Sequence, residues 1–165
     1  LHSLRRRQRQ MCIRDRRKHL PLTLNAVFNN LHDIAGIRLI VRFLSDVKTV
    51  EDLLATQADI KVLRVKDYIH HPKMNGYQSL HLILGVPVYT VDGPNIIEVE
   101  LQIRTIAMNF WASLEHELNY KKNVPHQDAL RLSLTKKAQL ITELDQEMDD
   151  IKRRMYEPKT PPKEV

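Results

Sequence analysis

Residues 97–104 read Ile97-Glu98-Val99-Glu100-Leu101-Gln102-Ile103-Arg104, a strict alternation of apolar and polar side chains. Because successive side chains of a β-strand point to opposite faces of the sheet, the four apolar residues face one way and the four polar residues the other. The polar face is either a functional surface or the ordinary solvated face of an antiparallel sheet. The spacing does not choose between these two interpretations.

Further strands are predicted around this one. Residues 79–89 and 96–104 predict a hairpin closed around Asp92-Gly93-Pro94-Asn95. Residues 37–43 alternate as well, with one predicted face formed by Ile37, Leu39, Val41 and Phe43 and the other by Arg38, Ile40 and Arg42. A strand of about eight residues is predicted near Ile60, and its alternation places Arg64 and Lys66 on a single face.

Helices are predicted between and after the strands. Ser45 is expected to cap a helix whose buried stripe is Val47, Val50, Leu53 and Leu54. A helix over residues 105–121 is expected to pack Ala107, Trp111, Leu114 and Leu118, and apolar residues from Leu22 to Leu31 also recur at helical spacing. Because the hairpin forces an antiparallel pair, the sheet is mixed and the predicted fold class is α+β or mixed α/β.

The last predicted helix follows Pro125 and runs to about Met155. Its apolar residues recur at steps of three and four, and they are Leu130, Leu134, Ala138, Ile141, Leu144, Met148, Ile151 and Met155. Such spacing gives a narrow apolar seam, which either folds back on the chain's own core or meets another chain.

Composition restricts the class of protein. The chain has 165 residues, 42% of them hydrophobic, which suits one packed domain, and no apolar run approaches the length of a membrane span. A cytoplasmic location without membrane contact is the simplest expectation. A single cysteine, Cys12, excludes an intramolecular disulfide and a structural zinc site built from several thiols.

Positive charge is concentrated at the start of the chain. The formal net charge is +6, but residues 1–18 alone carry eight Lys and Arg against one acid, Asp15, so the rest is nearly neutral. This segment has no apolar periodicity, and a chain that opens on Leu1 rather than Met also fits sequence that is not native. We therefore leave two interpretations open for residues 1–20: a native basic arm that contacts phosphates, including those of RNA, or a non-native segment.

Two carboxylates are candidates for chemistry. Asp33 sits just before Gly36, where a predicted helix gives way to a strand, and Glu100 lies in the alternating strand. Carboxylates are the ligands that Mg²⁺ prefers, usually one or two together with substrate phosphates. Asp33 alone is equally typical of a turn, and the alternation does not choose Glu100 over Glu98.

Cationic and aromatic residues supply the opposite half of a phosphoryl-transfer site. Arg64, Lys66 and Lys73 could stabilise phosphate charge, although each is also typical of a solvated surface. Tyr77 could stack on a base or pack on the sheet, and His81 could bind a ligand or be structural. The chain has none of the spacings GxGxxG, GxxxxGK[ST] and HExxH.

Several motifs occur together and in order. They are His32-Asp33-Ile34-Ala35-Gly36-Ile37-Arg38, Arg64-Val65-Lys66-Asp67-Tyr68, Lys73-Met74-Asn75-Gly76-Tyr77-Gln78-Ser79-Leu80-His81, Glu100-Leu101-Gln102-Ile103-Arg104-Thr105, and the run from Ala107 through Glu115-His116 to Asn119-Tyr120-Lys121. With these motifs, residues 22–151 resemble the RelA/SpoT synthetases, and in particular the small single-domain alarmone synthetases of the RelQ and RelP type.

The resemblance implies a nucleotidyltransferase-like fold and a GTP pyrophosphokinase, which transfers pyrophosphate from ATP to the 3′-hydroxyl of GTP or GDP and makes (p)ppGpp in the stringent response. It implies Asp33 and Glu100 as Mg²⁺ ligands, with Glu100 also the general base. The acceptor site would consist of Lys73, Tyr77, His81 and Asn119, and the ATP site of Arg38, Arg64 and Lys66.

The resemblance also bears on organisation. It implies a synthetase core over residues 21–125 and a helix over 126–156 that could assemble homotetramers. The proline-rich tail over residues 157–165 is expected to be disordered on composition alone. Related chains have a basic ATP-binding segment before the His-Asp motif, and residues 1–20 do not resemble it, so a fragment with a damaged ATP site is one interpretation that stays open. The open alternatives are a non-catalytic nucleotide- or RNA-binding module and a different nucleotidyltransferase.

Overall fold

The computed structural model describes residues 35–90, 93–121 and 124–157. The predicted helix over residues 22–31, the candidate Asp33, the basic segment 1–20 and most of the tail lie outside this range. Within it, a four-stranded mixed sheet and three helices confirm the predicted fold class. None of the described helices combines the length and apolar character needed to cross a membrane.

The sheet has the strand order β1-β4-β3-β2. Its strands are β1 (Ala35–Val41), β2 (Lys61–Asp67), β3 (Leu80–Thr90) and β4 (Gly93–Thr105). β1 runs parallel to β4, whereas β4 with β3 and β3 with β2 are antiparallel. The alternating strand of the sequence is therefore a central strand of the sheet, with a neighbour on each side.

The predicted hairpin is confirmed, but its turn is shorter than expected. Pairing of β3 with β4 continues to Thr90 opposite Gly93, so Pro94 and Asn95 lie in β4 rather than in the turn. Two residues remain between the paired ends, and two is the commonest length of a hairpin connection. Gly93 has φ 110°, a conformation that glycine adopts without steric cost.

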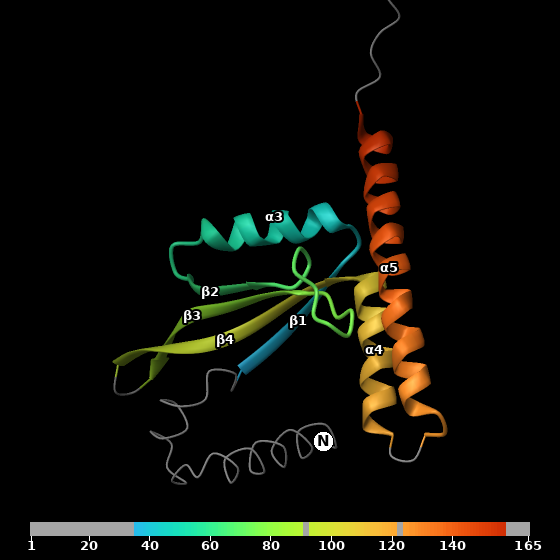
Figure 1. Ribbon diagram of the computed structural model, residues 1–165. Coiled ribbons are helices and arrows are strands. Elements are labelled where there is room, and N and C mark those ends of the chain that lie inside the picture. The colour runs from blue at the N-terminus through green and yellow to red at the C-terminus, as the bar shows by residue number, and fades with distance from the viewer. Residues whose placement is uncertain (1–34, 91–92, 122–123, 158–165) are drawn as a thin grey trace, which may run out of the picture.

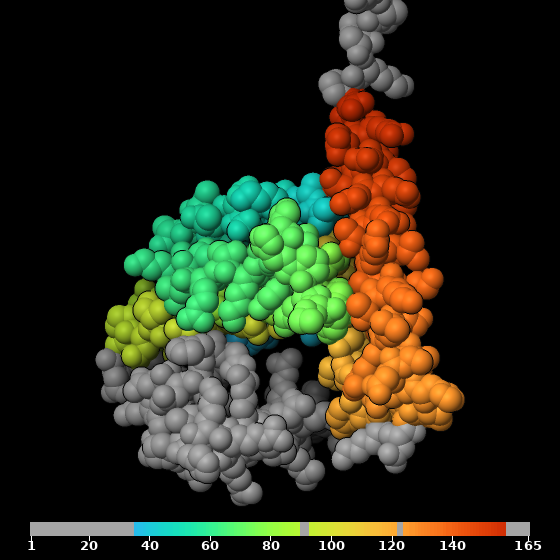
Figure 2. Space-filling model, in the orientation of Figure 1, coloured from blue at the N-terminus to red at the C-terminus, as the bar shows by residue number. Residues whose placement is uncertain are grey.

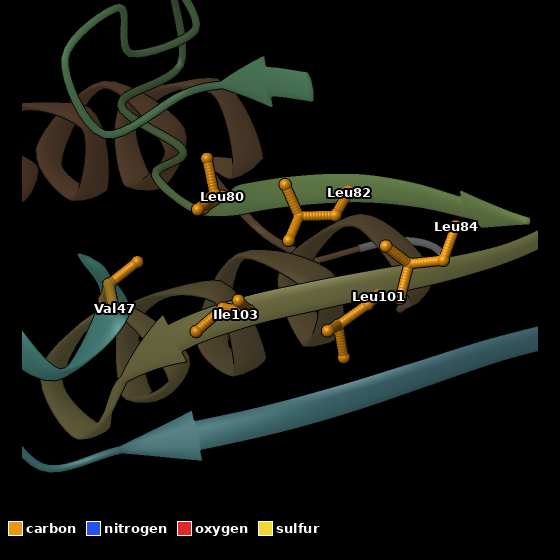
Figure 3. Close-up of a cluster of buried hydrophobic side chains, with 6 residues drawn as sticks. All are labelled: Val47, Leu80, Leu82, Leu84, Leu101 and Ile103. Atoms are coloured by element: carbon orange, nitrogen blue, oxygen red, sulfur yellow. The ribbon is translucent and has the colours of Figure 1, made fainter. Parts of the chain in front are cut away.

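Helix α3 (Leu44–Ala55) covers the apolar face of the sheet (Figure 1). Figure 3 shows the resulting core, which brings Val47 of α3 together with Leu80, Leu82, Leu84, Leu101 and Ile103 of the two central strands. The expected cap at Ser45 was wrong: the N-cap is Phe43, so α3 begins two residues earlier than a cap at Ser45 would place it. Leu53 is 58% exposed instead of buried, because it lies on the side of α3 that faces away from the sheet.

Helices α4 (Ile106–Tyr120) and α5 (Gln127–Tyr156) lie side by side at one end of the sheet (Figure 1). The face of α4 that is buried contains Met108, Trp111 and Ala112, whereas Leu114, expected to be buried, is 41% exposed. The indole of Trp111 donates a hydrogen bond to the Leu134 carbonyl of α5 at 2.8 Å. This contact ties the two helices together.

A buried hydroxyl fixes the junction of β4 with both helices. Thr105 caps α4 by accepting a hydrogen bond from the Met108 amide at 3.1 Å, and its hydroxyl donates to Asp145 of α5 at 2.6 Å. Burial raises the pKa of the Asp145 carboxyl above its usual range, and the nearby Asp149 acts in the same direction, while the hydrogen bond from Thr105 opposes them. The end of β4 is therefore held rigidly.

Candidate functional site

The strand register gathers most of the candidate residues on the sheet face opposite α3. Paired residues on neighbouring strands share a face. One cross-strand row runs through Lys66, His81, Gln102 and Arg38, and the next through Arg64, Ile83, Glu100 and Gly36. The prediction that Arg64 and Lys66 share a face is confirmed, although β2 carries a register shift between Val62 and Arg64.

Glu100 is held from both sides. Its Oε1 atom lies 3.0 Å from Nδ1 of His81, and its Oε2 atom accepts a hydrogen bond of 3.2 Å from the side-chain amide of Gln102. The Glu100 side chain is 21% exposed, so it remains reachable from solvent. These contacts give Glu100 a defined orientation on the polar face, whereas Glu98 lies further along β4, opposite Gly85.

Burial lowers the pKa of His81 below its usual range. The carboxylate of Glu100 opposes this shift, whereas the positive charges of Arg104 and Lys73 add to it. A lowered pKa disfavours the imidazolium form, so the neutral imidazole, a hydrogen-bonding group rather than a cation, is favoured at His81.

The loop between β2 and β3 brings Tyr77 onto His81. Its fold is fixed by the hydrogen bond from the Gly76 amide to the Lys73 carbonyl at 2.8 Å and by a positive φ of 89° at Gly76. A Cβ atom at Gly76 would lie 2.4 Å from the Ala138 side chain of α5, so only glycine fits there. Figure 2 shows this loop, in bright green, against the orange surface of α5.

The loop residue Tyr77 joins an aromatic and cationic cluster. Its hydroxyl lies 2.9 Å from Nε2 of His81, and the Lys73 ammonium lies 4.6 Å from the ring centroid of Tyr68 and 4.8 Å from that of Tyr77. Tyr68 also meets the His81 ring edge-on at a centroid distance of 5.2 Å. The structure thus brings Lys73, Tyr77, His81 and Glu100 together, as the sequence motifs imply.

Asn119 is not part of this cluster. It lines a separate pocket of about 370 Å³ between the loop, α4 and α5, together with Asn75, Trp111, Glu115, Arg131, Leu134 and Thr135. Its side chain donates to Glu115 and accepts from Arg131. It reaches Tyr77 only indirectly, because Glu115 also binds the Asn75 amide and Asn75 accepts from the Tyr77 backbone.

Sequence reasoning did not assign three residues that the structure places in the cluster: Tyr68, Gln102 and Arg104. Arg104 is 5% exposed, and its guanidinium donates to both the Tyr77 hydroxyl and the Gln102 side-chain oxygen. The alternation of β4 already placed Gln102 and Arg104 on the face of Glu100. Contacts with the loop, 27 residues away in sequence, could not be foreseen from that pattern.

The described residues contain no group of three or more His, Cys, Asp and Glu side chains arranged to hold a metal ion unaided. Glu100 offers hard carboxylate oxygens on an accessible face, which suits Mg²⁺ shared with substrate phosphates. The second candidate ligand, Asp33, lies outside the described residues.

Comparison with known proteins points in one direction. Residues 6–125 match the family model described as the region found in RelA/SpoT proteins. The match begins closer to the N-terminus than the motifs suggest, and it includes most of the basic segment 1–20. The chain is similar to two proteins of Bacillus subtilis, GTP pyrophosphokinase YwaC (42% identity, 84% of this chain) and GTP pyrophosphokinase YjbM (39%, 86%). It spans 66% of the length of each.

Solved structures agree with these relatives. The fold is similar to small alarmone synthetase 1 of Bacillus subtilis bound to its product pppGpp, with a TM-score of 0.76 and 37% identity over 90% of this chain and 74% of that one. It is also similar to the same synthetase bound to AMPCPP, with a TM-score of 0.64 and 34% identity over 89% of this chain and 73% of that one.

Proposed function

The chain belongs to the RelA/SpoT family, and from this premise we propose that it transfers pyrophosphate from ATP to the ribose 3′-hydroxyl of GTP or GDP. The observation that carries this proposal is the polar sheet face, where an oriented carboxylate, Glu100, lies between cationic residues and an aromatic loop. The product pppGpp and the ATP analogue AMPCPP bound to similar proteins support the two substrates.

Glu100 acts as the general base in this mechanism. It takes the proton of the acceptor's 3′-hydroxyl, whose oxygen attacks the β-phosphorus of ATP; the bond between that phosphorus and the α-phosphate oxygen breaks, and AMP leaves. Arg38, Arg64 and Lys66 flank Glu100 on the same face and would bind the ATP phosphates. Positioned cations supply much of the catalysis in such transfers, because charge accumulates on the phosphoryl oxygens.

The acceptor nucleotide would be recognised by the loop. Tyr77 offers a half-buried ring on which guanine can stack, and the His81 ring meets it edge-on. Lys73 and Arg104 both lie within 5 Å of the ring centroid, at 4.8 Å and 4.9 Å. A cation over a ring face blocks a base from that face, so we expect the exposed Lys73, not the buried Arg104, to move onto the acceptor's phosphates. Asn119 would contribute from the edge of the site, through Glu115 and Asn75.

Mg²⁺ would be held by Glu100 and Asp33 together with the phosphates, and it would neutralise part of the charge of two nucleotides brought into one site.

We expect the unmodified chain to make labelled alarmone from labelled ATP and GTP only when Mg²⁺ is present. Asp33→Asn should strongly lower product formation and raise the Mg²⁺ concentration needed for half-maximal rate. Normal rate and normal metal dependence in this variant would contradict the metal site. Nucleotide binding without any product would favour the non-catalytic alternative.

Assembly through α5 is a second part of the proposal. The seam of α5 divides in two: Leu134, Ala138 and Ile141 pack with Trp111 of the same chain, whereas Leu144, Met148, Ile151 and Met155 are exposed by 38–69%. Figure 1 shows the C-terminal part of α5 projecting beyond the sheet. A regular apolar stripe on a projecting helix is typical of a helix that meets another chain. We propose a homo-oligomer, with a tetramer as the form expected for small synthetases.

The double substitution Met148→Glu with Ile151→Glu should therefore lower the mass of the oligomer, because charges are costly in an apolar interface. It should not unfold the sheet, because both side chains are exposed in the single chain. Light scattering measures the mass, and circular dichroism checks the fold. Ser133→Glu with Gln146→Glu is the matched control, since it adds charges at two exposed polar positions of α5. If the unmodified chain is a monomer at tens of micromolar, the assembly proposal fails.

A further inference from the structure

Five side chains, with Glu100 among them, form a closed ring of hydrogen bonds. Glu100 contacts His81, His81 contacts the hydroxyl of Tyr77, and that hydroxyl accepts from Arg104. Arg104 also donates to the Gln102 oxygen at 3.3 Å, and the Gln102 amide donates back to Glu100. The ring joins the loop, β3 and β4, and its longest step in sequence is the 27 residues between Tyr77 and Arg104.

The chemistry of the ring's members fixes the direction of every hydrogen bond. A guanidinium can only donate and a carboxylate can only accept. Oε1 of Glu100 can only accept, so Nδ1 of His81 carries the proton of this contact. Nε2 of the neutral imidazole is then the acceptor, and the Tyr77 hydroxyl, which accepts from Arg104, donates its own proton to Nε2.

We propose that Arg104 is a positioning residue for the base Glu100, acting through the hydroxyl of Tyr77 and the ring of His81. This inference rests on the proposed role of Glu100. Tyr77 then has two separate functions: its ring face binds the acceptor's base, and its hydroxyl transmits the orientation set by Arg104. Each carboxylate oxygen of Glu100 has two lone pairs and accepts one hydrogen bond in the ring, so a lone pair remains to take the 3′-hydroxyl proton.

The surroundings of Arg104 suit this role. Arg104 is 5% exposed and His81 is 7% exposed, so solvent does not compete for their hydrogen bonds. The next residue, Thr105, is completely buried and bound to both α4 and Asp145 of α5, which fixes the backbone from which Arg104 extends. Groups that orient a reacting residue are effective when they are held in this way by rigid elements.

Tyr77→Phe is the direct test, because it removes the hydroxyl and keeps the ring. Without the hydroxyl, Nε2 of His81 has no donor, and Glu100 alone favours the imidazole proton on Nδ1 and the orientation of the imidazole. We expect kcat to fall about tenfold, a loss typical of groups that orient a reactive ligand from the outer shell, while the KM for the acceptor changes less than twofold. The matched control is Tyr89→Phe, at an exposed tyrosine outside the ring of hydrogen bonds. An unchanged kcat in Tyr77→Phe overturns the proposal.

A spectroscopic measurement separates this inference from the proposed activity. Long-range ¹H–¹⁵N spectra of the full chain report the tautomer of His81, assigned with a His81→Gln variant. We expect the Nδ1–H tautomer in the unmodified chain and a smaller fraction of it in Tyr77→Phe, where Glu100 alone favours it. Arg104→Met, which has no donor to hold the Tyr77 hydroxyl, should lower the Nδ1–H fraction in the same direction, and Arg104→Lys, which keeps a donor, should restore part of it. If the unmodified chain shows the Nε2–H tautomer, the proposed positioning of Glu100 by Arg104 is wrong, whether or not the chain makes alarmone. If it shows the Nδ1–H tautomer but makes no product, the result counts against the proposed reaction and not against the hydrogen-bonded ring.

Discussion

Glu100→Gln is expected to lower kcat by roughly 10²–10⁴-fold while nucleotide binding stays close to that of the unmodified chain. The substitution keeps the shape of the side chain and removes its ability to take a proton from the 3′-hydroxyl. His81 can still donate to the new amide oxygen, so the fold around the site should persist. Single-turnover kinetics give the rate, and equilibrium dialysis with each nucleotide gives the affinities.

Glu98→Gln is the matched control for this experiment. Glu98 lies on the same strand and face, but it pairs with Gly85 rather than with a residue of the hydrogen-bonded ring. The same loss of one carboxylate charge should therefore leave most of the turnover intact. Near-normal turnover in Glu100→Gln, or an equal loss in both variants, would remove the basis for assigning Glu100 as the base.

Period-two alternation predicted the candidate face well. It placed Glu100, Gln102 and Arg104 together on β4 and Arg64 with Lys66 on β2, and the sheet register confirms both placements. Alternation is reliable here because a strand has only two faces, and one of them is buried by α3. The roles of these residues came from the motifs, not from the alternation.

Helix faces and loop contacts were predicted less well. The apolar residues Leu53 and Leu114 fit helical spacing, yet both are exposed, because spacing alone does not say which part of a wide apolar stripe meets the sheet. Asn119 was grouped with Tyr77 by its motif, but the structure places it in the pocket beside Glu115 and Arg131. These positions depend on how α4 and α5 pack, which is decided by tertiary contacts.

The hydrogen-bonded ring could not be predicted for a related reason. Arg104 and Tyr77 are 27 residues apart, and they meet only because Gly76 lets the loop pack closely against Ala138 of α5. A long-range contact of this kind leaves no periodic signal in the sequence. The only hint was the polar face of β4, which shows where Arg104 points but not what it contacts.

Tyr77→Ala is expected to raise the KM for GTP or GDP roughly 5- to 150-fold, since stacking of a base on an aromatic side chain is worth about 1–3 kcal/mol. The KM for ATP should change little, because Arg38, Arg64 and Lys66 lie on the sheet strands rather than in the loop. Initial rates with one nucleotide varied and the other saturating measure the two constants separately.

Comparison with Tyr77→Phe isolates the contribution of the ring. Both variants lack the hydroxyl, so both lose the hydrogen bond to His81 and the fall in kcat that follows from it. Only Tyr77→Ala also loses the ring face, and the difference in acceptor KM between the two variants therefore measures stacking alone. Equal increases in the KM for acceptor and for ATP would place Tyr77 outside the acceptor site, and an acceptor KM that is the same in both variants would show that the ring carries none of the binding.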